Sequence, residues 1–183
     1  MRQETRDLLS FLRRPSSIVV VITFCVQVMF RGDLSRFGYS LFSQWDHLDW
    51  NHWLGNIVPV YFFTFLLENK IGKFKTWIFL LLSLAFCQIS FVLPWAPPLN
   101  ELTQVVGLSG LVCGLCGYWC FVPSQKWACI SARVLTLLLF IVSIQADPYT
   151  RWGHAAGWIF GFTFWAFQSL SYRSLSFGLK KSH

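Results

Sequence analysis

Six apolar stretches, each close to the length of a membrane-crossing helix, occupy most of this 183-residue chain. A helix needs about 20 predominantly apolar residues, within a range of roughly 17 to 25, to cross the hydrocarbon core of a bilayer. The chain is 55% hydrophobic and only 13% charged, unlike an ordinary soluble domain. We therefore expect one all-α membrane domain over residues 1–183, with spans at approximately 16–30, 51–67, 76–94, 108–122, 128–146 and 154–172.

The placement of Lys and Arg between these stretches predicts the orientation of the chain, because positive residues remain on the cytoplasmic side of a membrane. Basic residues precede the first stretch, separate the second from the third and the fourth from the fifth, and follow the sixth. The other links hold only Arg31, Arg36 and Arg151. We expect cytoplasmic N and C termini. The net charge of +7 is spread over one membrane face without a basic patch, so we expect no nucleic-acid partner.

The six cysteines lie within or beside the apolar stretches, which argues against a disulfide framework. Cys113 and Cys116 form a CxxC, and Cys120 lies on the same helix face, so metal or redox chemistry is one interpretation. No second ligand pair accompanies them, and small soft side chains pack well between helices. We expect no metal and no cofactor.

Polar residues mark the starts of the second, fourth and sixth stretches. Ser109 begins the fourth, His154 begins the sixth, and His52 is followed one helical turn later by Asn56 in the second. In the predicted orientation all of these starts lie at the external face. Because ionisable side chains are costly inside a bilayer, they are functional candidates by default. Ser109 is a candidate nucleophile, His154 a candidate base, and His52 with Asn56 a candidate donor pair for an oxyanion.

Glycines in the fourth and sixth stretches predict a close approach between these two helices, since small residues let helix backbones meet. Each feature also has a purely structural explanation: a GxxxG commonly marks packing, and a serine in a span usually bonds its own i−4 carbonyl. The combination with Ser109 and His154 favours a catalytic site. The glycines are Gly110, Gly114 and Gly117 in the fourth stretch, and Gly157 and Gly161 in the sixth.

Together the motifs GLSG with Ser109, GHAAGWIFG with His154 and HLDWNHWLGN with His47, His52 and Asn56 resemble the rhomboid family of intramembrane serine proteases. LLENKIG after the second stretch adds to the likeness. The resemblance implies a six-helix rhomboid-type bundle in a bacterial inner membrane. It also implies a catalytic dyad without an acid, in which Ser109 attacks the scissile carbonyl and His154 moves the proton. The other implied site residues are His52, Asn56, Gly107 and Leu108 for the oxyanion and substrate, and His47, Gly110, Gly157 and Gly161 in support.

The implied substrates are single-span or C-terminally anchored membrane proteins cut near the external face. Two departures from the family pattern stand out. The first external link is short and lacks a Trp-Arg pair, and Cys113 occupies a position where the family often has a tyrosine that stacks on the catalytic histidine. The short link favours the rhombosortase type of rhomboid. The alternatives are a non-proteolytic rhomboid-like binder or quality-control factor and, less favoured because the chain has no repeated halves, a small transporter.

Overall fold

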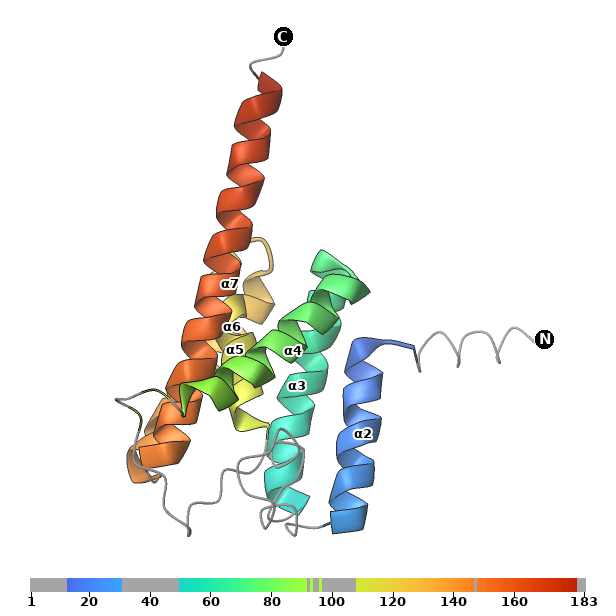
Figure 1. Cartoon of the computed structure of the whole chain (residues 1–183), viewed down its shortest axis with the longest axis vertical. Coiled ribbons are helices and arrows are strands. Elements are labelled where there is room, and N and C mark those ends of the chain that lie inside the picture. The colour runs from blue at the N-terminus through green and yellow to red at the C-terminus, as the bar shows by residue number, and fades with distance from the viewer. Residues whose placement is uncertain are drawn as a thin grey trace, which may run out of the picture.

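The computed structural model describes residues 13–30, 50–91, 93, 96, 108–146 and 148–180. Within these ranges the chain forms six helices and no strand, which confirms the predicted all-α class for the described residues (Figure 1). The helices are α2 (Pro15–Phe30), α3 (Trp50–Ile71), α4 (Lys73–Ser90), α5 (Ser109–Trp119), α6 (Lys126–Gln145) and α7 (Pro148–Lys180).

The largest difference from the predicted boundaries is in α7, and α5 is the shortest helix of the described residues. Helix α7 begins at Pro148 and runs for 33 residues, because proline needs no hydrogen-bond acceptor at the first position of a helix. Helix α5 has only 11 residues, or roughly 17 Å at 1.5 Å per residue. It ends early because the chain tightens into i→i+3 turns over residues 118–122, just before Pro123.

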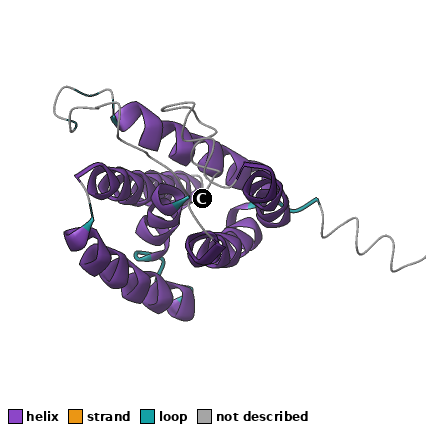
Figure 2. Ribbon diagram, turned by 90° about the horizontal axis from the view of Figure 1, so that it is seen from below, coloured by secondary structure: helices purple, strands orange, loops and turns teal. Residues whose placement is uncertain are grey.

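Helix α5 forms the centre of the described bundle. Every residue from Leu111 to Trp119 is buried, and the helix packs most extensively against α7, with α3, α4 and α6 around it. Figure 2 shows the helices side by side, seen from below. The Trp119 indole N–H donates to the carbonyl of Phe63 in α3 at 3.2 Å. A short helix rich in glycine is therefore enclosed by its neighbours rather than exposed on the surface.

Glu68 joins α3 to the beginning of α2. Its Oε1 accepts the backbone N–H of Ser16 at 2.6 Å, and its Oε2 lies 4.0 Å from Arg14. The first N–H groups of a helix have no intrahelical acceptor and carry partial positive charge, so a carboxylate stabilises them. This carboxylate belongs to the LLENKIG motif. Gly72, in the same motif, has φ 85°, which allows the abrupt turn from α3 into α4.

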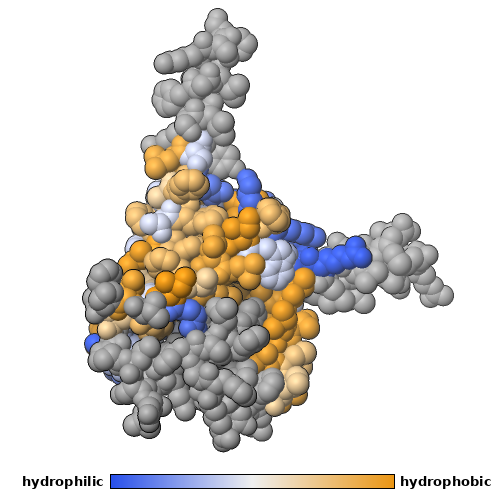
Figure 3. Space-filling model, in the orientation of Figure 1, coloured by the Kyte–Doolittle hydropathy of each residue, from blue (hydrophilic) through white to orange (hydrophobic). Residues whose placement is uncertain are grey.

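The sides of the bundle are hydrophobic where they face outward. Large apolar side chains on α6, including Leu137, Phe140 and Ile141, are more than half exposed. In Figure 3 the hydrophobic colour covers much of the visible flank, and hydrophilic residues gather toward the turn from α3 to α4. An exposed surface made of many large apolar side chains marks contact with lipid or protein.

Among the described residues, two helices are long and apolar enough to cross a membrane by length and composition, α4 and α6. The Pro15–Met29 segment is a shorter apolar helix. Helix α5 is too short to pass such a test, and α3 carries His52, Asn56 and Glu68. The number of spans and the orientation of the termini therefore stay predictions.

Helices α3, α5 and α7 run in one direction and the other three run in the opposite direction. The three parallel helices all begin toward the lower end of the bundle as drawn in Figure 1. Their first two turns carry the polar residues that the sequence singled out. The topology thus gathers three chain segments with candidate chemistry at one end of the molecule.

Candidate active site

Ser109 and His154 belong to the first two turns of the two most closely packed helices. Ser109 is the first residue of α5, and His154 lies in the second turn of α7. Both are partly exposed, in a bundle whose centre is otherwise buried. A polar residue at a helix start can remain accessible while the rest of its helix is enclosed.

Glycine contacts bring these two helix starts together. A Cβ built on Gly110, next to Ser109, would lie 3.5 Å from the carbonyl oxygen of Gly153, which is next to His154. A Cβ on Gly157 would meet the carbonyl of Gly110 well inside van der Waals contact. The same holds for a Cβ on Gly161 and the carbonyl of Gly114. Helices α5 and α7 therefore touch through their backbones, which only glycine permits.

Helix α4 contacts the start of α7 next to His154. The Trp152 indole N–H donates to the carbonyl of Ser90 at 3.0 Å, and the Cys87 thiol lies 3.9 Å from the carbonyl of Gly153. A Cβ on Gly110 would come within 3.0 Å of the Cys87 sulfur. Three helices thus meet within one turn of His154, so the backbone that carries the imidazole is held on two sides.

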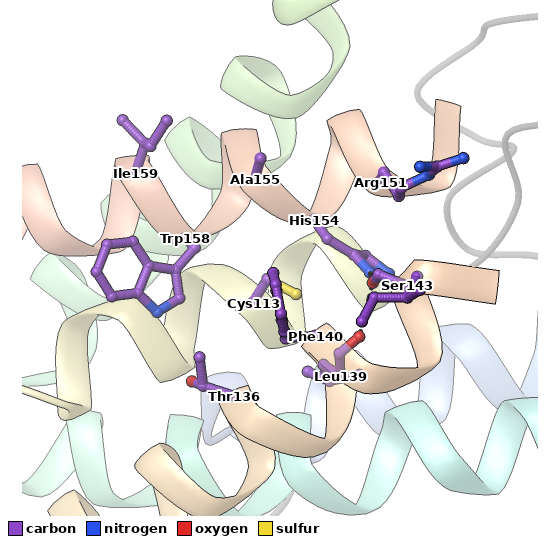
Figure 4. Close-up of a pocket in the computed structure, with 11 residues that line it drawn as sticks. Cys113, Thr136, Leu139, Phe140, Ser143, Arg151, His154, Ala155, Trp158 and Ile159 are labelled. Atoms are coloured by element: carbon purple, nitrogen blue, oxygen red, sulfur yellow. Dashed lines mark hydrogen bonds between the residues drawn. The ribbon is translucent and has the colours of Figure 1, made fainter. Parts of the chain in front are cut away.

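The imidazole of His154 points toward helix α6. Its Nδ1 lies 2.6 Å from the hydroxyl oxygen of Ser143, and Figure 4 shows the two side chains directed at each other from α7 and α6. The Ser143 hydroxyl also lies 2.6 Å from the carbonyl oxygen of Leu139, one turn earlier in α6. The Nδ1 atom of the imidazole is therefore hydrogen-bonded to a buried serine.

A cavity of about 570 Å³ lies between α6 and α7 and includes His154. Its walls are mainly apolar, and Arg151 is the one formally charged group among them. Cys113, one helical turn after Ser109, also lines this cavity (Figure 4). The remaining lining residues are Thr136, Leu139, Phe140, Ser143, Ile144, Ala155, Trp158 and Ile159. The cavity therefore links the wall of α5 beneath Ser109 to the imidazole.

The second candidate pair lies on α3. Asn56 is 5% exposed, and its side-chain nitrogen has no hydrogen-bond partner among the described residues. His52, one turn earlier, is partly exposed. A buried amide N–H without an acceptor destabilises the folded protein. A bound ligand that supplied an acceptor would remove this cost.

The other predicted site residues divide into two groups. Leu108 is fully buried and directly precedes α5, and Gly110, Gly157 and Gly161 lie at the contact between α5 and α7. His47 and Gly107 lie outside the described residues. The structure therefore describes every predicted site residue except His47 and Gly107.

The six cysteines are free thiols. Cys113, Cys116 and Cys120 are all buried on α5 or directly after it. Within the described ranges no group of three or more His, Cys, Asp and Glu side chains could hold a metal ion. Cys113 thus contributes to this site as part of the cavity wall.

Sequence reasoning did not find Ser143, Cys87 or Trp152. Ser143 had a signal, since it is a polar residue in the apolar run LLLFIVSIQ. That signal has an ordinary explanation, because a serine in a helix commonly bonds its own i−4 carbonyl. Only the three-dimensional arrangement reveals that the same hydroxyl also meets an imidazole 11 residues away.

These features define a helical bundle with an apolar exterior and a serine and a histidine at adjoining helix starts. A model of the rhomboid domain family matches residues 31–170, which is more than half of the chain. The chain belongs to the rhomboid family. Rhomboid proteins are integral membrane serine proteases that act on membrane-protein substrates within the bilayer. A comparison with curated proteins found no match.

Proposed function

We propose that this protein is an intramembrane serine endopeptidase in which Ser109 is the nucleophile and His154 the general base. One observation carries the proposal: contacts through Gly110, Gly153 and Gly157 join the helix turns that hold the serine and the imidazole. A nucleophile and its base must come within hydrogen-bonding reach, and a base is commonly oriented by a third group. His154 has such a neighbour in Ser143.

The chemistry follows from the two side chains. The Ser109 hydroxyl oxygen attacks the carbonyl carbon of the scissile bond while His154 Nε2 takes the hydroxyl proton. The tetrahedral intermediate collapses, the C–N bond breaks, and His154 returns the proton to the leaving amine. A water molecule, deprotonated by the same imidazole, then hydrolyses the acyl-enzyme ester and regenerates Ser109.

Three groups are available to stabilise the oxyanion. Ser109 opens α5, and the first N–H groups of a helix have no intrahelical acceptor. Asn56 supplies a buried amide nitrogen without a partner among the described residues, and His52 lies one turn away on the same helix face. Removal of one oxyanion donor typically costs about 3 to 4 kcal/mol in transition-state stabilisation. We propose that Leu108, which directly precedes α5, also contributes to substrate binding, together with Gly107.

The apolar surroundings of the site support the proposal that its substrates lie in the membrane. The flank of α6 is apolar, and the cavity that includes His154 is also apolar. We propose six spans, cytoplasmic termini and a bacterial inner membrane location, with cleavage near the external face. Single-span or C-terminally anchored membrane proteins are the proposed substrates, and the short first link favours the rhombosortase type.

The decisive test is Ser109→Ala in purified protein reconstituted in liposomes with a single-span reporter. We expect loss of reporter cleavage and loss of labelling by a fluorophosphonate probe, because both require the serine oxygen. Circular dichroism and size-exclusion chromatography verify that the variant folds.

Ser131→Ala is the matched control, since Ser131 is an exposed serine on α6. This variant should retain cleavage and labelling. Full cleavage by Ser109→Ala would refute the proposal. Unchanged binding of the reporter by both variants, with no product from the unsubstituted protein, would instead indicate a non-proteolytic binder.

A further inference from the structure

We infer that Ser143 is a positioning residue for the catalytic base: its hydroxyl fixes both the orientation and the tautomer of His154. The inference rests on the proposed function, because it assigns His154 as the base. It adds a third side chain, from a helix that carries neither Ser109 nor the oxyanion candidates.

Two contacts of one hydroxyl determine the direction of the hydrogen bond. The Ser143 oxygen lies 2.6 Å from the Leu139 carbonyl oxygen and 2.6 Å from His154 Nδ1. A carbonyl oxygen can only accept, so both contacts are hydrogen bonds only when the single hydroxyl proton of Ser143 points to Leu139. The serine oxygen must then accept a hydrogen from Nδ1. Nδ1 therefore carries the ring proton of a neutral His154.

The tautomer decides which nitrogen can act as a base. In a neutral imidazole one nitrogen is a donor and the other an acceptor. With the proton on Nδ1, the lone pair belongs to Nε2, the nitrogen proposed to take the proton from Ser109. In Ser-His-Asp triads a carboxylate enforces this tautomer, and its loss disturbs catalysis without moving the backbone. The neutral Ser143 hydroxyl, which donates its own proton to Leu139, can enforce the same tautomer of His154.

Ser143 is well placed to hold the ring still. It is 8% exposed, and its bond to Leu139 limits rotation of the hydroxyl. The backbone of His154 is fixed independently, because Trp152 and Gly153 are bonded to α4. With the backbone held by α4 and Nδ1 held by α6, little freedom remains for the imidazole.

Kinetics of Ser143→Ala provide the first measurement. We expect kcat to fall about tenfold, the scale of one hydrogen bond, with KM nearly unchanged because Ser143 acts on the base rather than on substrate binding. Ser143→Thr keeps the hydroxyl, and its extra methyl group can occupy the adjoining cavity of about 570 Å³. We expect this variant to recover most of the lost kcat.

Thr136→Val is the matched control. Thr136 belongs to the same helix and lines the same cavity, and its hydroxyl lies 3.6 Å from the Cys120 sulfur. The substitution removes a hydroxyl without changing the shape of the side chain, and kcat should stay within about twofold of the unsubstituted protein. A fall equal to that of Ser143→Ala would show that any lost hydroxyl in this cavity has the same effect, and would overturn the inference.

The second measurement needs no activity. With ¹⁵N-labelled histidine, the ring nitrogens of His154 report the tautomer by NMR, and the His154→Ala spectrum identifies their signals. We expect a protonated Nδ1 in the unsubstituted protein, in Ser143→Thr and in the inactive Ser109→Ala variant. In Ser143→Ala we expect a mixture of tautomers.

The outcomes separate the two proposals. A protonated Nε2 in the unsubstituted protein, or an unchanged tautomer and kcat in Ser143→Ala, would overturn the role of Ser143 and leave the protease proposal intact. Cleavage by Ser109→Ala would overturn the protease proposal. The tautomer measurement would then still test the contact between Ser143 and His154.

Discussion

Gly157→Ala tests whether the backbone contact between α5 and α7 sets the geometry of the site. The added methyl group would meet the carbonyl of Gly110 and would lie 3.3 Å from Cβ of Cys113. Neither atom can swing aside like the tip of a flexible side chain, because one is backbone and the other is the first carbon of a buried residue. Helix α7 must therefore move away from α5.

The expected magnitude has a structural and a catalytic part. Overpacking costs about 1 to 3 kcal/mol, and the better helix propensity of alanine returns about 1 kcal/mol. We expect a net loss of up to about 2 kcal/mol in the free energy of unfolding. Gly157 lies one turn from His154, and Gly110 is next to Ser109. A shift of about 1 Å between them should lower kcat/KM about 100-fold.

Unfolding in mixed detergent micelles and reporter cleavage in liposomes measure the two parts. Gly55→Ala is the stability control, since a Cβ on Gly55 would meet nothing within 4 Å. That variant should be unchanged or more stable by up to about 1 kcal/mol. Gly161→Ala meets the same interface farther from the site, so it should lose stability with a smaller loss of activity. A Gly157→Ala protein with unchanged stability and unchanged kcat/KM would refute the reasoning.

Two further predictions concern charge. Glu68→Ala removes the acceptor of the Ser16 N–H and should lower the free energy of unfolding by about 1 to 3 kcal/mol, because a buried donor loses its partner. Asn69→Ala, at an exposed neighbouring position, should stay within about 0.5 kcal/mol, and an equal effect in both variants would contradict this role. Reporter cleavage should also fall on acidification with a one-proton dependence, because a charged imidazole cannot accept a proton from Ser109. A cleavage rate that stays flat from about pH 5 to 9, with the fold intact by circular dichroism, would argue against His154 as the base.

Much of this architecture follows from local rules. Apolar length predicts the positions of the helices, and the small residues Gly110, Gly114, Gly157 and Gly161 predict which two helices approach most closely. The parallel directions of α3, α5 and α7 follow from counting stretches, since alternate helices of such a bundle must run the same way. These rules suffice to bring the first turns of three helices to one end.

The details of the site depend on contacts that no local rule predicts. Ser143 bonds its own i−4 carbonyl, as a serine in any apolar helix would, and its sequence environment says nothing about a histidine 11 residues later. Cys87 and Trp152 contribute through the side-by-side packing of α4 and α7. The predicted helix ends were also imprecise, because α7 begins at Pro148, before the apolar stretch that predicted it.

The position of Ser143 on α6 links His154, the proposed base, to a helix with open surroundings. Helix α6 packs mainly against α5 and makes few contacts with α7, and the cavity of about 570 Å³ separates the two helices. Many of its apolar side chains face outward. A hydrogen bond of 2.6 Å tolerates little displacement, so movement of the end of α6 away from α7 would break the contact with His154. Segments with few buried contacts are the ones that move at low cost. We therefore expect proton transfer from Ser109 to His154 to depend on where α6 lies when the substrate is bound.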